Sequence, residues 1–333
     1  MITAELRRAL AVLGSAAGLD GADPLLRPGP GPGAYASSLP FRLARPGQDP
    51  RQVAAELAVQ LSEETWIAEP AGSGYLTVTV SHDALASLAV RIARAGPACA
   101  ASDALRGRAI LAPPPADLAA APGWPQARAT LAAELTARLA ATAGATVSFA
   151  AERSVVPQPS PAPAAGPQLN PVAVAIEYAG VDAVRFALAR MPPAGAASWP
   201  RAAVIARHVL ANPAYAVRYA HAAAAAVLRW AAVLGTKPAG FRPRLLAEPG
   251  ELALLDALSW LPERVAMAAR RGRPDEFARY LEELAAGTID TMDTTGFSTI
   301  SSISSERLWL ADAARTALAA GLGLLGISAP GRL

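Results

Sequence analysis

The side chains that could do chemistry are few in this chain, and they are scattered along it. The three histidines, His82, His208 and His221, stand in the contexts Ser-His-Asp, Arg-His-Val and Ala-His-Ala, and Lys237 is the only lysine. One class of enzymes activates its substrate with ATP by placing paired histidines and a lysine-rich loop against the phosphates, where developing charge must be neutralised. Neither arrangement is possible here, and the Gly-Lys-Ser/Thr of a P-loop does not occur. We therefore expect no nucleotide-activating site.

Two short motifs resemble a cofactor-binding and a catalytic motif, but their positions in the chain do not suit either function. Residues 321–326 spell Gly-x-Gly-x-x-Gly, the dinucleotide-binding pattern, at the end of a predicted helix rather than after a strand. Ser81, His82 and Asp83 are adjacent in sequence, whereas a catalytic triad converges from separate segments, and these residues suit a helix cap. The single cysteine, Cys99, excludes an internal disulfide and a cysteine-rich metal site. We expect neither a cofactor nor a metal.

Positive charge is concentrated in one stretch of the chain. Between Ala183 and Ala247 there are nine basic residues and no acidic one. The nine are Arg185, Arg190, Arg201, Arg207, Arg218, Arg229, Lys237, Arg242 and Arg244. Tyr215, Tyr219 and Trp230 lie among them, and cations interleaved with aromatic rings are typical of phosphate contacts and base stacking. The alternative is a solvated basic face without a ligand.

The aromatic and histidine side chains of this stretch also admit structural interpretations. Tyr215 and Tyr219 are four residues apart and share one face of a helix, so they could form a core stripe. The neighbouring cations favour an exposed face instead. His221, in an alanine-rich helix, is more typical of a packed or capping histidine than of a general base.

The first half of the chain has the pattern of α/β structure. Asp49 before Pro50 predicts a helix start, and residues 65–67 and 75–80, separated by a Gly-Ser-Gly turn, predict a hairpin. Asp83 is expected to open a further helix. Residues 108–113, 125–143 and 147–149 then predict a strand, a helix and a second strand, and the five prolines of residues 156–167 predict a stiff linker.

From Asn170 onward the pattern is helical, so the fold class is mainly α. Helices are predicted over residues 174–189, 200–210, 213–234, 251–259 with a break at Pro262, from Pro274 onward, and over 306–325. The Ser- and Thr-rich residues 288–305 predict a mobile loop.

Several segments resemble the arginyl-tRNA synthetases. Residues 212–221, Asn-Pro-Ala-Tyr-Ala-Val-Arg-Tyr-Ala-His, resemble the family's Asn-Pro-x-Tyr-Tyr-Val-Gln-Tyr-Ala-His helix. Residues 180–188 resemble the Asp-Ala-Leu-Arg segment that names the DALR anticodon-binding domain, and residues 321–330 resemble its C-terminal end. In the first part, Tyr35-Ala36-Ser37-Ser38 and the turn of residues 71–76 resemble the family's N-terminal add-on domain, which reaches the tRNA elbow at its D-loop.

The resemblance implies a mainly α protein in three parts. Residues 1–95 form an arginyl-tRNA synthetase N-terminal-like α/β domain, residues 96–168 a degenerate remnant of the catalytic domain with the Pro-rich linker, and residues 169–333 a DALR-type all-helical anticodon-binding domain. The motifs of the catalytic domain are absent. The family's second tyrosine, glutamine and final arginine on the key helix are replaced by Ala216, Arg218 and Ala223.

These observations predict a non-catalytic tRNA-binding protein that contacts the anticodon region through its C-terminal helical domain. Tyr215 and Arg218 are expected on an exposed helix face. The implied tRNA-binding residues are Asn212, Tyr215, Arg218 and Tyr219, with Arg207 and Arg229. The alternative is a protein-interaction partner or regulator of a full-length aminoacyl-tRNA synthetase that no longer binds tRNA. No signal peptide or membrane span is evident, so a cytoplasmic location without membrane contact is expected.

Overall fold

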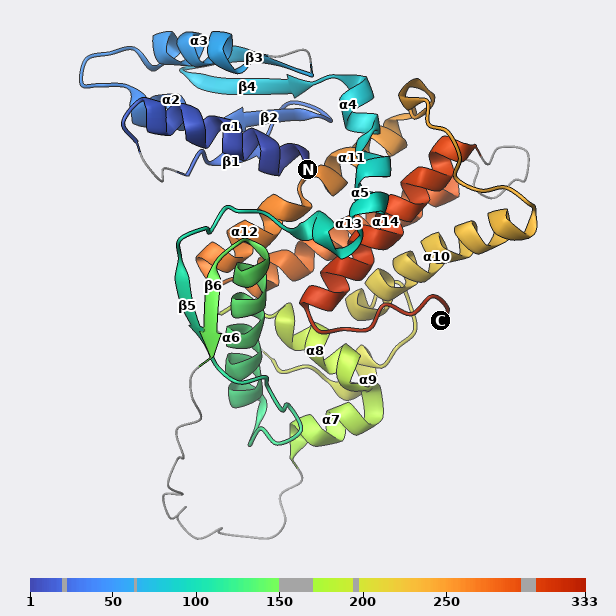
Figure 1. Ribbon diagram of the computed structural model, residues 1–333. Coiled ribbons are helices and arrows are strands. Elements are labelled where there is room, and N and C mark those ends of the chain that lie inside the picture. Colours follow the sequence, from blue (N-terminus) through green and yellow to red (C-terminus); the bar gives the residue numbers. More distant parts are fainter. Residues whose placement is uncertain (20–22, 63–64, 150–169, 194–197, 295–303) are drawn as a thin grey trace, which may run out of the picture. The chain divides into compact units, whose positions relative to one another are not determined.

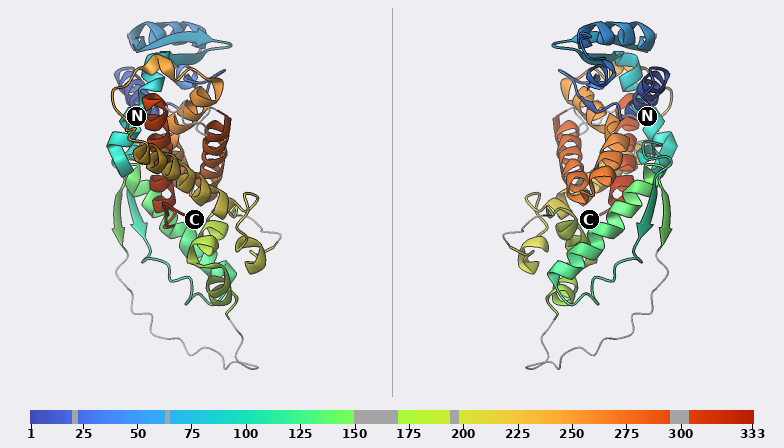
Figure 2. Two further views of the ribbon diagram at one scale, coloured as in Figure 1. Left: turned by 90° about the vertical axis from the view of Figure 1, so that its right-hand side faces the viewer. Right: turned by 90° about the vertical axis from the view of Figure 1, so that its left-hand side faces the viewer.

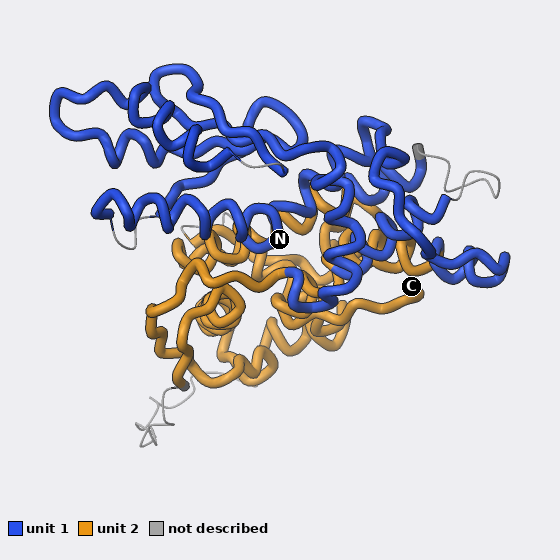
Figure 3. Tube along the Cα trace, turned by 45° about the horizontal axis from the view of Figure 1, so that its top comes forward, with its two compact units in different colours: residues 1–99, 227–262, 287–316 blue, residues 100–226, 263–286, 317–333 orange. Residues whose placement is uncertain are grey.

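The computed structural model describes residues 1–19, 23–62, 65–149, 170–193, 198–294 and 304–333. The chain divides into two compact units, each assembled from three separate segments (Figure 3). Unit 1 comprises Met1–Cys99, Val227–Pro262 and Gly287–Thr316, and unit 2 comprises Ala100–Ala226, Glu263–Ala286 and Ala317–Leu333. The architecture is mainly helical, as the sequence predicted.

Unit 1 contains a four-stranded antiparallel sheet in the order β1-β2-β4-β3 (Figure 1). Its strands are β1 (Leu26–Pro28), β2 (Ala34–Ser37), β3 (Trp66–Ala71) and β4 (Tyr75–Val80). Helix α3 (Pro50–Leu61) packs on the sheet through Val53, Leu57 and Leu61, and the Asp49 carboxylate caps it by accepting from the Arg51 N–H at 2.9 Å. The predicted hairpin and helix start are both confirmed.

The turn of this hairpin requires glycine at its last position. Gly74 has a φ of 128°, which L side chains rarely adopt, and a Cβ built there would lie 2.6 Å from the Pro50 side chain. The Gly-Ser-Gly turn therefore lets the hairpin approach the first turn of α3.

A second set of contacts in unit 1 joins the sheet to helix α11 (Pro249–Ser259). The Tyr35 ring of β2 is fully buried, lies 5.4 Å from the Trp260 ring centroid, and donates its hydroxyl hydrogen to Ser259 Oγ at 2.7 Å. Burial raises the pKa of the Tyr35 hydroxyl, so it remains a donor at neutral pH. Asp256 accepts from the Gly33 N–H at 2.9 Å. Residues more than 220 positions apart in the sequence thus share one core.

Further helices and turns belong mainly to unit 1. They are α1 (Ile2–Ala16), α2 (Leu39–Leu43), α4 (His82–Ala86), α5 (Leu88–Ala95), and the 3-10 turns η1 (Gly96–Ala100) and η2 (Pro243–Leu245). The helix predicted to open at Asp83 begins at His82, because the Ser81 hydroxyl caps it by accepting from the Ala84 N–H.

Unit 2 contains a parallel strand pair, β5 (Ala109–Ala112) and β6 (Thr146–Phe149), linked by helix α6 (Trp124–Thr142). Figure 2 shows α6 lying beside the two strands. The predicted strand-helix-strand order is confirmed, and its origin as a catalytic-domain remnant stays an interpretation. The buried Glu134 on α6 accepts hydrogen bonds from Arg138 and Arg185, each at 2.7 Å, and from the Ala116 N–H at 2.9 Å.

The remaining helices are α7 (Pro171–Ala179), α8 (Val181–Ala189), α9 (Ala202–Ile205), α10 (Pro213–Val233), α12 (Leu261–Arg271), α13 (Pro274–Thr294) and α14 (Ser305–Leu324). Helices α10, α13 and α14 each contribute residues to both units. The break predicted at Pro262 is confirmed as the junction of α11 and α12.

Three helix predictions were wrong in extent. The helix predicted over 174–189 is two helices, because Gly180 adopts a φ of 83° between them. Only Ala202–Ile205 of the predicted 200–210 helix is helical. Residues 288–294 belong to α13 rather than to a loop. The predicted Pro-rich linker lies outside the described residues.

Candidate nucleic-acid interface

Asn212 directly precedes α10 and fixes the backbone that leads into this helix. It is 8% exposed, and its amide nitrogen donates to the backbone oxygens of Ile205 and Arg207 at 2.8 and 2.7 Å. These bonds satisfy carbonyls that a continuing α9 would have used, which explains the short helix. Both hydrogens of the amide are thus occupied and Asn212 positions residues 205–212, while its predicted contact with tRNA stays a prediction.

That segment brings three aromatic rings into one stack at the beginning of α10. The His208 and Tyr215 rings have centroids 5.4 Å apart at 13°, and the Tyr215 and Tyr219 rings follow at 5.8 Å and 25°. Tyr219 is 37% exposed, His208 is exposed, and Tyr215, between them, is half-buried. The two tyrosines are therefore neither a sealed core stripe nor fully solvated. We call these three rings the aromatic stack.

His208 was missed as an interface residue by the sequence. It precedes Tyr215 by seven residues, and a continuous helix through residues 200–210 would not have indicated its position. The loop that Asn212 holds folds it back against the tyrosine. Only the local Arg207-His208 pair, a cation beside a ring, could have drawn attention to it.

Arg218 is less exposed than the sequence predicted. It is half-buried, lies 3.8 Å from the Asp182 carboxylate, and donates to Ser328 Oγ at 3.4 Å. Three residues on, the His221 ring bonds to the Pro330 backbone oxygen at 3.0 Å. This side of α10 binds the last residues of the chain, which confirms the packed interpretation of His221.

The basic stretch is less positive in space than in sequence, because acidic residues from other elements pair with it. Within the described residues, at least five of its nine cations form ion pairs. The pairs are Arg185–Glu134 at 2.7 Å, Arg190–Glu282 at 2.6 Å, Arg218–Asp182 at 3.8 Å, Arg242–Glu306 at 3.2 Å and Arg244–Asp83 at 3.7 Å. The sequence could not reveal this, since every partner lies outside residues 183–247.

The cations that stay available in unit 2 are Arg201 and Arg207. Both are exposed, and neither forms an ion pair within the described part of the chain. They flank α9, and Arg207 directly precedes His208 of the aromatic stack. Arg229 and the exposed Lys237 belong to unit 1, and Arg229 is half-buried. A surface with stacked rings beside unpaired arginines suits an unpaired, negatively charged strand.

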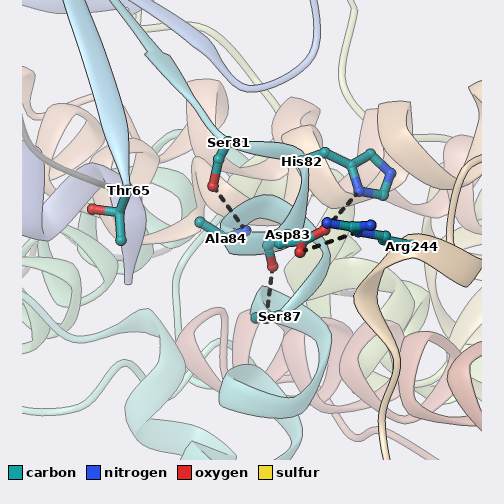
Figure 4. A pocket seen from close by; sticks show the side chains of 7 residues that line it. All are labelled: Thr65, Ser81, His82, Asp83, Ala84, Ser87 and Arg244. Carbon is teal, nitrogen blue, oxygen red and sulfur yellow. Dashed lines mark hydrogen bonds and ion pairs between the residues drawn. The ribbon is translucent and has the colours of Figure 1, made fainter.

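The groups that could suggest other chemistry are engaged in structural bonds. In Figure 4 Ser81 points to the Ala84 amide while His82 lies toward Asp83 and Arg244. The second ring nitrogen of His82 bonds to the Leu246 backbone oxygen at 2.9 Å. Burial raises the pKa of the Cys99 thiol to about 12, which leaves it protonated and inert.

The described residues also lack two kinds of feature. They contain no group of three or more His, Cys, Asp or Glu side chains placed to hold a metal ion. Among the helices in those same ranges, none is long and apolar enough to cross a bilayer.

Comparison with known families matches both ends of the chain. Residues 1–80 match the arginyl tRNA synthetase N terminal domain, and residues 217–333 match the DALR anticodon binding domain. The chain is related to the arginyl-tRNA synthetases. The implied presence of an N-terminal-like domain and a DALR domain is thereby confirmed, while the boundaries predicted at residues 95 and 168 stay predictions.

Relatives of this synthetase-related chain are full synthetases of which it spans a minor part. It is 40% identical over 163 residues to the arginine–tRNA ligase of Clavibacter sepedonicus, covering 47% of this chain and 29% of that one. The corresponding enzyme of Kineococcus radiotolerans is 38% identical over 164 residues, with 47% and 29% covered. The solved arginyl-tRNA synthetase of Thermus thermophilus superimposes with a TM-score of 0.71 and 15% identity, covering 100% of each chain, a likeness of fold.

Proposed function

We propose that this chain is a non-catalytic tRNA-binding protein that contacts the anticodon region through its C-terminal helical domain. The observation that carries the proposal is the DALR anticodon binding domain over residues 217–333. The aromatic stack and the unpaired Arg207 beside it, at the start of α10, supply the chemistry that binds loop nucleotides: rings for unstacked bases and a cation for phosphate.

The absence of catalysis is proposed from the sequence. His82, His208 and His221 are far apart along the chain, Lys237 is the only lysine, and residues 121–125 read Ala-Pro-Gly-Trp-Pro where the family has its His-x-Gly-His turn. Without these groups the charge on ATP phosphates stays unneutralised in the transition state. We expect the purified chain to show no arginine-dependent ATP–pyrophosphate exchange, with or without tRNA. Exchange that persists after removal of any contaminating synthetase would contradict the proposal.

A second candidate function is a protein partner of a full-length synthetase that does not bind tRNA. Two observations favour it. Five of the nine cations of the basic stretch are ion-paired, and the last turns of α10 expose Trp230 at 72% and Val233 at 86%. Exposed apolar side chains three residues apart lie on the same side of a helix, where a protein partner could cover both. The two functions separate in a titration with free tRNA, for which the partner function predicts no affinity.

A further inference from the structure

A pocket of about 320 Å³ lies within unit 2. None of the three rings of the aromatic stack lines it. It is an open pocket lined by residues of α8, α9, the first turn of α10, and residues 198–201. Its volume falls at the lower end of the roughly 300–1,000 Å³ of small-molecule sites, which suits a single compact ligand rather than a docked helix.

Several apolar side chains line the pocket, and two parts of its wall have further contacts. Phe186, 1% exposed, and Met191 line it together with Trp199. The Trp199 indole stacks on Trp124 at 6.4 Å and 9°, and Arg128 donates to the Met191 backbone oxygen at 3.2 Å. A preformed apolar slot with an aromatic wall is suited to a flat ring.

One polar group of the pocket has a fixed orientation. Asn212 lines it, and both hydrogens of its amide are used by the backbone oxygens of Ile205 and Arg207. This assigns the remaining atom, Oδ1, as an acceptor, and that oxygen has no hydrogen bond to any residue in the described ranges. Although Asn212 is 8% exposed as a whole, Oδ1 is not one of the buried side-chain atoms without a partner, so it is accessible from the pocket and can accept from a ligand N–H.

The rim of the pocket is positive. Arg190 and Arg201 line it, and none of the described lining residues is acidic. Arg190 shares one nitrogen with Glu282 at 2.6 Å, whereas Arg201 forms no ion pair with the residues that the structure describes. A flat ring, an N–H donor and a negative charge are thus the three features that the pocket would recognise together.

We propose that this pocket binds one nucleoside monophosphate unit whose base carries an exocyclic amino group. The base enters the slot beside Trp199, its amino group donates to Asn212 Oδ1, and the phosphate lies at Arg201. The same unit can come from a free nucleotide or from an unpaired nucleotide of an RNA. The inference does not require the proposed binding of a whole tRNA.

Calorimetric titration of the full chain with AMP, IMP, CMP and UMP tests the free source. AMP and IMP differ by an amino group against a carbonyl oxygen, as do CMP and UMP, so the amino member of each pair is expected to bind roughly tenfold more tightly, because the oxo member leaves Asn212 facing an acceptor. A second arm titrates short single-stranded oligoadenylate and oligouridylate. Binding of the oligonucleotides alone, with the amino preference, identifies RNA as the source.

Two pocket variants and a matched control complete the test. Arg201→Glu, at an exposed position, is expected to weaken binding at least tenfold, and Trp199→Ala to weaken it as well, with thermal melting measured for both. Arg45→Glu places the same charge change at an exposed position of unit 1, away from the pocket and the aromatic stack, and is expected to leave nucleotide binding unchanged. The inference is overturned if AMP and IMP bind with equal affinity. It is also overturned if no nucleotide binds saturably and Arg201→Glu leaves oligonucleotide binding unchanged. Intact tRNA binding in that case leaves the proposed function standing.

Discussion

At the scale of single residues, the aromatic stack and the surrounding arginines separate binding from packing. Tyr219 ends the stack at 37% exposure, and no other ring covers its outer side among the described residues. Stacking of one base is worth about 1–3 kcal/mol by alanine substitution, which is roughly ten- to hundredfold in affinity. We expect Tyr219→Ala to weaken tRNA binding by that factor, and Tyr219→Phe, which keeps the ring, to retain most of it.

The control for this prediction is Trp230→Ala. Trp230 is more exposed than Tyr219 and also lies on α10, but it belongs to unit 1 and to the apolar surface that favours a protein partner. It should leave tRNA affinity unchanged. A gel-shift or fluorescence titration of all three variants decides the point, and a larger loss from Trp230→Ala than from Tyr219→Ala would move the interface to the other end of the helix.

The arginines Arg207 and Arg218 should behave oppositely. Arg207 is exposed and unpaired in the described chain, so Arg207→Ala is expected to keep the melting temperature and to lower the slope of log K against log salt by about one phosphate contact. Arg218 is tied to Asp182 and Ser328, so Arg218→Ala should cost up to about 1 kcal/mol of stability and leave that slope unchanged. A slope lowered only by Arg218→Ala would restore its predicted role as a phosphate contact.

At the scale of elements, the sequence predicted those whose signals are local. The Asp49–Pro50 helix start, the glycine turn of the hairpin, and the long helices α10 and α14 follow from capping, turn chemistry and periodicity. The end of α9 did not follow, because it depends on a side-chain amide seven residues beyond it, at Asn212. The neutralisation of the basic stretch was equally hidden, since Glu134, Asp182 and Glu282 pair with it only in the folded chain.

The element most dependent on one side chain is α6. Glu134 is 8% exposed and joins α6 to α8 through Arg185, whose side chain is 11% exposed. Removing one partner of a buried ion pair typically costs about 3–5 kcal/mol, because the other charge stays buried and unpaired. We expect Glu134→Ala to lower the free energy of unfolding by that amount in chemical denaturation.

The matched control is Glu282→Ala. Its partner Arg190 is 47% exposed, so solvent screens the pair and the expected cost is about 0–1 kcal/mol. If both variants lowered the free energy of unfolding equally, Glu134 would stabilise the fold no more than a surface carboxylate does.

At the scale of the whole molecule, the interleaving of the two units restricts how the function can be assigned. Each unit is built from three separate segments, so a cut near residue 167 would divide segments that share a core, as Tyr35 and Ser259 do. If such a fragment failed to bind tRNA, the cause could be loss of its fold, and the result would not show that the binding site lies elsewhere. Point variants in the full chain are the appropriate probes of where binding resides.

The central claim, that this chain binds tRNA through charge and stacking, is tested most directly by titrating the full chain with tRNA across a salt series. The account predicts measurable affinity that falls steeply between low and physiological salt, with a slope smaller than nine phosphate contacts would give, because five of the nine cations are ion-paired within the described residues. No binding at low salt, or an affinity that does not change with salt, would contradict it and leave the protein-partner function in its place.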